Sequence, residues 1–162
     1  VGSLDPRKNL PTLLAAYEQL RVTQPDPPAL VLAGPAGRET ALAGRSGVHL
    51  TGWLDEGELR GLVAGSRALV LPSLDEGFGL PVLEALACGR PVVTSEAPAL
   101  LEVAGSQAVT APATDPAALA DALRRALAQD DDGPARAARR ARARLFTWAT
   151  TADRTLDASL DA

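Results

Sequence analysis

The sequence predicts a doubly wound α/β domain, in which a parallel β-sheet is covered by helices on both faces. Short apolar runs, typical of strands buried on both faces, alternate with segments of helical periodicity along most of the chain. No internal repeat is present. The length of 162 residues suits one domain with its own core and is too short for two.

The first half of the chain begins with a loop and then alternates helix and strand. Residues 1–9, VGSLDPRKN, predict the end of a strand that runs into a loop, so we expect the start of the domain, or a preceding domain, to lie upstream. Pro11 stands at a tolerated first-turn position of the first helix. The predicted elements are helices at 10–23 and 55–66, the second with Asp55 as N-cap, and strands at 29–34 and 47–54.

The second half continues the same alternation. The predicted strands are 67–73, 90–95 and 107–112, and the predicted helices are 80–89, 97–105 and 114–130. Thr114 or Asp115 is expected to cap the last of these helices in front of Pro116.

Composition and charge limit the classes of function. A net charge of −4 argues against a general nucleic-acid binder, because phosphate-backbone affinity needs a clustered positive face. No apolar run approaches the roughly 20 residues that span a bilayer, and the first residues show no signal-peptide pattern, so a cytoplasmic protein is the default expectation. Any anion site must therefore be local.

Several conspicuous residues favour structural roles. Asp130–Asp132 contains an Asp-x-Asp pattern, but its place between two helices favours a solvated loop over a metal site. The arginines between 136 and 144 favour a solvated helix face over a lipid or nucleic-acid contact. Cys88 is expected to be a small buried side chain and not a reactive thiol, and His49 a structural residue of a strand.

Two strand-to-helix loops are expected to share one edge of the sheet. GSLDPRKN, residues 2–9, and SLDEGFGLP, residues 73–81, both follow predicted strands and precede predicted helices. Ligands of open parallel sheets bind outside the carboxyl ends of the strands, where such loops meet. We refer to this edge as the rim, and the candidate functional residues lie there.

The loop before the helix at 80–89 predicts an anion site. Gly77 and Gly79 let the backbone approach a ligand closely, and Pro81 pre-sets the first helical turn. Free backbone N–H groups are then expected at Phe78, Gly79, Leu80 and Val82. Unsatisfied donors and the helix dipole together favour an anion at such a helix start.

Charged residues around this anion site suggest the kind of ligand. Glu76 and Glu84 are expected on opposite sides of the anion, and Arg7 with Lys8, the only lysine of the chain, would neutralise it. A nucleoside diphosphate sugar has the matching layout of ribose diol, diphosphate and sugar diol. No metal is then required. The alternative for each acid is a favourable interaction with the helix dipole alone.

These segments together resemble a known family. EGFGLPVLEALACGRPVVTS, VGSLDPRKNL, LVLAGP, VHLTGWLDEGELRGLVAGSRALVLPS and LLEVAGSQA resemble the C-terminal half of the family 4 retaining glycosyltransferases, whose GT-B fold pairs two Rossmann-like domains. The similarity runs from Val1 to about Ala128 and includes a Glu-x7-Glu motif. The variant GSLDPRKN looks most like the mannosyltransferase-like branch, which uses GDP-mannose.

The resemblance implies roles for individual residues. Three are implied to be catalytic: Glu76 contacts hydroxyls of the donor sugar, and Arg7 and Lys8 form the phosphate clamp. The implied donor-binding residues are Glu84, which holds the ribose, Gly77, Phe78, Gly79 and Leu80 around the sugar and diphosphate, Trp53 and Leu54 in the base-binding loop, and Gly2 and Ser3. Many members carry arginine where Ser3 stands, and many carry a Gly-Gly pair that is absent at 97–99, which puts a backbone contact there in doubt.

The hypothesis is therefore the donor-binding domain of a retaining glycosyltransferase that transfers a hexose. The resemblance favours mannose from GDP-mannose over a UDP-sugar, implies no metal or other cofactor, and places the acceptor in an N-terminal domain absent from this chain. Residues 133–162 would pack toward that domain, the full-length enzyme would be cytoplasmic or peripheral at the membrane, and the isolated domain would be inactive. The alternative is a stand-alone nucleotide- or phosphate-binding module without transfer activity.

Overall fold

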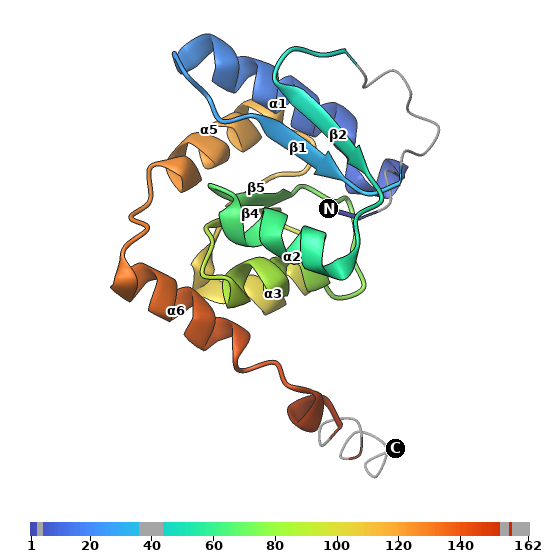
Figure 1. Ribbon diagram of the computed structural model, residues 1–162, viewed down its shortest axis with the longest axis vertical. Helices are drawn as coiled ribbons and strands as arrows, with labels where there is room; N and C mark the ends of the chain where they lie inside the picture. Colours follow the sequence, from blue (N-terminus) through green and yellow to red (C-terminus); the bar gives the residue numbers. More distant parts are fainter. Residues whose placement is uncertain (3–4, 36–43, 153–155, 157–162) are drawn as a thin grey trace.

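The computed structural model describes residues 1–2, 5–35, 44–152 and 156, and shows an α/β arrangement (Figure 1). Ser3, one of the predicted donor-binding residues, lies outside the described residues. The helices are α1 (Leu10–Thr23), α2 (Glu56–Gly65), α3 (Leu80–Ala87), α4 (Pro98–Ala104), α5 (Pro116–Leu127) and α6 (Gly133–Ala143). The strands are β1 (Leu30–Ala33), β2 (Val48–Gly52), β3 (Leu69–Leu71), β4 (Val92–Ser95) and β5 (Ala108–Ala111).

All five strands pair in parallel, which confirms the predicted fold class. They form two sheets, however, where the sequence predicts one: β1 pairs with β2, and β4 lies between β3 and β5. Val92 at the centre of the second sheet is opposite both Leu69 and Ala108. The described residues place no strand between β1 and β3.

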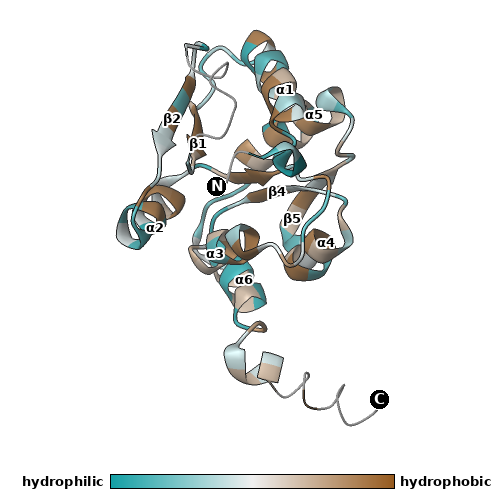
Figure 2. Cartoon of the chain, turned by 90° about the vertical axis from the view of Figure 1, so that its right-hand side faces the viewer, coloured by the Kyte–Doolittle hydropathy of each residue, from teal (hydrophilic) through white to brown (hydrophobic). Residues whose placement is uncertain are grey.

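Helices cover both faces of the strand layer. One core cluster joins α1 and α5 to residues of β1, β4 and β5, among them Leu32 and Val93. A second cluster joins α2, α3 and α4 to the opposite face, where Val92 and Leu100 are fully buried. Figure 2 shows the hydrophobic colour of β1 and β4 between these helices. Neighbouring residues of β4 therefore serve opposite faces, as period-two alternation requires.

Local sequence signals fix the starts of several helices. Asp55 forms a full capping box on α2, with its carboxylate accepting from the Glu58 N–H and the Glu58 side chain accepting from the Asp55 N–H. Asp115, and not Thr114, caps α5 and accepts from two backbone N–H groups. The predicted N-cap at Asp55 is thus confirmed, and the alternative at Thr114 is wrong.

The exposed segment after α5 is tied to the domain by ion pairs. Asp131 accepts hydrogen bonds from Arg90 and Arg136. The hydrogen bond from Arg136 is the main cause that lowers the pKa of Asp131 to about 2, against the opposing effect of burial. Arg139 of α6 is buried and donates to the Gly89 carbonyl oxygen. The prediction of a solvated arginine face is therefore wrong for Arg139, whereas Asp131 is exposed, as the prediction of a solvated loop requires.

Helix α6 packs on this domain itself. It contacts α3, and Arg142 donates to the backbone carbonyl oxygens of Glu102 and Val103 at the end of α4. Just beyond α6, Phe146 meets Phe78 edge-to-face, with the ring centroids 5.9 Å apart. Packing of residues 133–162 toward another domain stays a prediction.

Candidate functional site

Three charged residues from two loops meet at the rim. Arg7 and Lys8 lie on the 3₁₀ turn Pro6–Lys8, and Glu76 lies in the loop between β3 and α3. Arg7 Nη1 is 2.8 Å from Glu76 Oε2, and Lys8 Nζ is 2.7 Å from Glu76 Oε1. The structure thus brings together the three residues that the sequence predicts to be catalytic, and it pairs Glu76 directly with both bases.

Glu76 is held in its charged form. Burial by itself raises its pKa, but hydrogen bonds from Lys8, Ser73 and Arg7 outweigh this effect, and the pKa of Glu76 is lowered from its ordinary value. The Ser73 hydroxyl donates to Oε1 over 2.7 Å. The side chains of Glu76 and Lys8 are only 8% and 11% exposed, whereas Arg7 is 44% exposed. The Glu76–Lys8 pair is therefore the buried part of the cluster.

Asn9 ties the loops of the rim together. Its side-chain Nδ2 donates to the carbonyl oxygens of Pro72 and Ala113 over 3.1 and 2.6 Å. Its backbone is left-handed with φ of 56°, which allows the chain to turn directly from the 3₁₀ helix into α1. The Leu74 N–H also donates to the Arg7 carbonyl oxygen at 2.9 Å. These contacts fix the basic turn against the loop that carries Glu76.

The two glycines of the GFG turn differ in what they do. Gly79 is the N-cap of α3 with φ of 99°, and a Cβ there would lie 2.6 Å from Leu100 Cδ2. Around Gly77 no described atom comes within 4 Å of such a Cβ. The fold therefore requires glycine at 79 and leaves open space at 77, where a ligand can approach the backbone.

Phe78 and Leu80 are exposed side chains on either side of this cap, 41% and 57% accessible respectively.

One detail of the predicted anion site is wrong. The Val82 N–H is not free, because it donates to the Gly79 carbonyl oxygen at 2.9 Å and so closes the first turn. The amides of Phe78, Gly79 and Leu80 remain the candidate anion donors.

Glu84 stands apart from the charged cluster. It lies in the second turn of α3, and no described group donates a hydrogen bond to its carboxylate. Burial is the main cause that raises the pKa of Glu84 above its ordinary value. The structure thus gives the two acids different environments: Glu76 accepts three hydrogen bonds, whereas the Glu84 carboxylate accepts none from the described residues.

The remaining predicted residues lie at the edges of the cluster. Trp53, which is 75% exposed, and Leu54 occupy the loop between β2 and α2. No described hydrogen bond or ring contact joins them to Glu76 or Lys8. Gly2 has φ of 113° and lies against the Lys8 side chain, whose Cε would be 3.4 Å from an added Cβ.

The sequence reasoning missed three residues of the site. Ser73 and Asn9 position Glu76 and the basic turn, and Phe146 contacts Phe78 from the far end of the chain. The place of Ser73 at a strand end was the only local signal for its role. Asn9 has the residue type of an N-cap for α1, but its side chain makes no cap hydrogen bond.

The cluster keeps unused hydrogen-bonding capacity for a ligand. An ammonium has three donors, a guanidinium five and a carboxylate about four acceptor positions. Within the described residues, Lys8 donates once, Arg7 twice from its side chain, and Glu76 accepts three times. The bases can therefore bind an anion while Glu76 still has one free acceptor position. Among the described residues no group of three or more His, Cys, Asp or Glu side chains is placed to hold a metal ion.

Comparison with known proteins identifies the family. The family model described as "Glycosyl transferases group 1" matches residues 1–129. The chain belongs to the group 1 glycosyl transferases. O-antigen chain mannosyltransferase B of Escherichia coli is 35% identical to this group 1 chain over 168 residues, which cover 98% of the chain and 44% of that protein. Glycogen synthase of Mycobacterium tuberculosis is 38% identical over 177 residues, covering 100% of the chain and 42% of that protein.

Solved structures agree on the fold. Sucrose-phosphate synthase of Thermosynechococcus elongatus matches with a TM-score of 0.77 and 27% identity, over 99% of this chain and 44% of that one. Anabaena HepE in complex with UDP matches with a TM-score of 0.75 and 20% identity, over 99% and 48%, a likeness that shows the fold alone. The resemblance to family 4 enzymes of the GT-B class is confirmed.

The group 1 chain spans less than half the length of these relatives. No helix in the described part of the chain is both long and apolar enough to cross a membrane.

Proposed function

We propose that this group 1 domain binds the nucleoside diphosphate sugar donor of a retaining hexosyltransferase whose full length includes a separate acceptor-binding domain. The cluster of Arg7, Lys8 and Glu76 beside the start of α3 carries this proposal. It combines two cations, backbone amides at a helix start and a fixed carboxylate within one rim. These are the groups that a diphosphate linked to a polyhydroxylated sugar needs.

Mannose from GDP-mannose is the favoured donor. The relatives named above include a mannosyltransferase and a glycogen synthase, so they agree on hexosyl transfer and differ in the hexose. A further relative, 36% identical over 102 residues, is named a GDP-mannose-dependent mannosyltransferase of Mycobacterium tuberculosis. This name, together with the GSLDPRKN variant of the basic loop, supports GDP-mannose over a UDP-sugar.

The geometry suggests how each group would act. Lys8 and Arg7 would neutralise the diphosphate and stabilise the charge that it gains when its bond to the anomeric carbon breaks. The amides before α3 would add donors to the same oxygens. Glu76 would accept from a sugar hydroxyl through its free acceptor position, and Glu84 from the ribose. No metal ion is required for this division of roles.

Calorimetric titration of the 162-residue chain with GDP, GDP-mannose, UDP and UDP-glucose tests the proposal. We expect weak, saturable binding, tightest for GDP-mannose, and no sugar transfer by this chain alone. Absence of saturable binding to all four compounds in a folded sample would overturn the proposal. Equal binding of the nucleotides with and without a sugar would instead favour a nucleotide-binding module without transfer activity.

Glu84→Gln tests the role of the second acid. We expect nucleotide affinity to fall by about tenfold, because a charged acceptor for the ribose hydroxyls is replaced by a neutral one. Glu18→Gln is the matched control, since Glu18 is an exposed acid on α1 whose pair with Arg21 is a surface contact. Equal affinities of the two variants would leave Glu84 with only the helix-dipole role.

A further inference from the structure

The GFG turn before α3 is held by a residue from beyond α6. Phe78 stands between Gly77 and Gly79, so its side chain is the only one that these three residues offer for packing. The Phe78 ring meets the Phe146 ring edge-to-face, with centroids 5.9 Å apart and an angle of 81° between the ring planes. Aromatic pairs of this geometry gain more than the burial of their surface alone. Phe146 therefore holds the one side-chain anchor of the turn.

Arg142 holds Phe146 in its turn. The guanidinium Cζ lies 5.0 Å from the centroid of the Phe146 ring, which is a cation–π contact. The same guanidinium donates to the carbonyl oxygens of Glu102 and Val103 at the end of α4. Gly105 has φ of 54°, and an added Cβ there would lie 3.1 Å from Arg142 Cζ, so glycine leaves room for the guanidinium. We call Arg142 and Phe146 the clamp.

Helix α4 supports the GFG turn by two routes. Leu100 of α4 is fully buried, and its Cδ2 would lie 2.6 Å from a Cβ added to Gly79. The end of the same helix holds the clamp, which reaches Phe78. Around Gly77 no described atom comes within 4 Å of an added Cβ. The first half of the turn therefore depends on the clamp, and the second half on Leu100.

The backbone groups that the clamp fixes are the candidate anion donors. These are the amides of Phe78, Gly79 and Leu80, since the Val82 N–H already donates within α3. A turn with two glycines has much conformational freedom to lose when it binds a ligand. If only a fraction of the molecules has the competent turn, the apparent affinity falls by that fraction. A clamp that orders the turn beforehand removes this loss.

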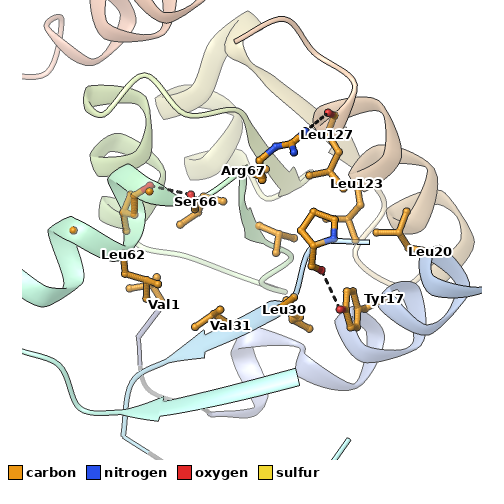
Figure 3. A pocket seen from close by; sticks show the side chains of 18 residues that line it. Val1, Tyr17, Leu20, Leu30, Val31, Leu62, Ser66, Arg67, Leu123 and Leu127 are labelled. Atoms are coloured by element: carbon orange, nitrogen blue, oxygen red, sulfur yellow. Dashed lines mark hydrogen bonds between the residues drawn. The ribbon is translucent and has the colours of Figure 1, made fainter. Parts of the chain in front are cut away.

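The interior of the domain offers a different kind of surface. An apolar cavity of about 490 Å³ lies between β1 and β3 (Figure 3). The Tyr17 and Ser66 hydroxyls that line it donate to backbone carbonyl oxygens, and Arg67 points to the Leu127 carbonyl oxygen. Its polar side chains are thus engaged with the backbone. The free amides of the turn make the rim the better place for an anion.

We propose that Arg142 and Phe146 are positioning residues of the donor site, which order the GFG turn before the diphosphate binds to its amides. Neither residue belongs to the charged cluster, and both act through Phe78. The identity of the anion rests on the proposed function, whereas the ordering of the turn rests on the contacts of the clamp alone.

Nitrogen-15 relaxation of the 162-residue chain tests the clamp without any ligand. In Phe146→Ala we expect the backbone order parameters of residues 77–79 to fall from about 0.85 to about 0.6 or below. Phe146→Leu keeps an apolar side chain against the core cluster of α3 and α4 and removes the ring contact, so it should show the same fall. Trp148→Ala is the matched control, because Trp148 is 89% exposed, and should leave the turn unchanged.

Calorimetric titration with GDP tests the effect on binding. We expect the affinity of Phe146→Ala for GDP to be about threefold to tenfold below that of the wild type. Bound GDP should restore the order of the turn in this variant, because the anion then supplies the missing constraint. Arg142→Gln should lower the affinity in the same direction. Arg144→Gln, which changes an exposed arginine at the same helix end, should not.

The two measurements separate failure of the clamp from failure of the proposed function. Unchanged order at residues 77–79 in both Phe146 variants, or an equal fall in Trp148→Ala, would overturn the clamp whatever the melting temperatures. A disordered turn with unchanged GDP affinity would overturn its part in donor binding. If the wild type binds no GDP, the proposed function fails, and the order parameters still confirm or refute the ordering of the turn.

Discussion

Replacement of Lys8 by methionine removes the charge of the buried cluster and keeps most of the side-chain volume. The Nζ–Oε1 distance to Glu76 is 2.7 Å, and both side chains are nearly buried. Breaking a buried ion pair from one side costs roughly 3 to 5 kcal/mol, because it leaves an uncompensated charge. Arg7 and Ser73 still donate to Glu76 in the variant. We therefore expect a smaller loss, about 2 kcal/mol in the free energy of unfolding at pH 7.

The loss should depend on pH. The pKa of Glu76 in the folded protein is below its ordinary value of 4.5, so the charged carboxylate contributes stability above pH 4.5. That contribution is lost as the pH falls through 4.5 and then through the lower folded-state pKa. In Lys8→Met the folded-state pKa is higher, and less stability remains to be lost. The difference between wild type and variant should therefore be largest at neutral pH and shrink in acid.

Urea unfolding at pH 7 and at a pH below 4.5 measures both effects. Arg60→Met is the matched control, since Arg60 pairs with Glu56 at 2.7 Å but the side chains are 72% and 87% exposed. Such a surface pair contributes at most about 0.5 kcal/mol. If Lys8→Met loses no more stability than Arg60→Met at pH 7, or loses the same amount at both pH values, the buried pair does not have the energetic role inferred from its geometry.

Other substitutions separate fold from ligand binding. Gly79→Ala should lower the free energy of unfolding by about 1 to 3 kcal/mol, because the added Cβ would meet Leu100 and the φ of residue 79 is positive. Gly77→Ala should leave the free energy of unfolding nearly unchanged and weaken nucleotide binding in calorimetry. Phe146→Ala should cost about 1 to 2 kcal/mol in urea unfolding through its lost contact with Phe78, and the 89% exposed Trp148 should tolerate alanine. Equal losses of stability in Gly79→Ala and Gly77→Ala would contradict the structural role of Gly79. Equal losses in Phe146→Ala and Trp148→Ala would contradict the packing role of Phe146.

The sequence predicted the positions of the helices and strands better than it predicted which strands lie side by side. Apolar runs and capping residues such as Asp55 act locally, so the helices and strands fall close to the expected positions. An apolar run indicates a buried strand but not which strand pairs with it. The division into two sheets was therefore not predicted. The same limit explains Arg139, where the arginine-rich pattern indicates a solvent-facing helix and only the packed structure shows burial beside Gly89.

In the candidate site, too, local features were predicted and long-range contacts were not. The residue types at the rim were predictable, because positive charge, glycine and a helix start are local features. The pairing of Glu76 with Lys8 joins residues 68 positions apart. It depends on Asn9, whose side chain donates to the loop that carries Glu76 and to the loop after β5. No pattern in either loop encodes that contact. The sequence thus predicted which charged groups gather at the rim, and did not predict that they pair with one another.

This pairing changes how donor binding would proceed under the proposed function. Two acids on opposite sides of a diphosphate would bind sugar and ribose independently of the phosphates. In the structure, however, the Lys8 and Arg7 side chains hold Glu76, so a diphosphate that takes these cations as partners weakens their hold on the carboxylate. Freed acceptor positions of Glu76 then become available to the sugar hydroxyls. Sugar recognition is therefore coupled to phosphate recognition, and a free sugar without its diphosphate should compete poorly for Glu76.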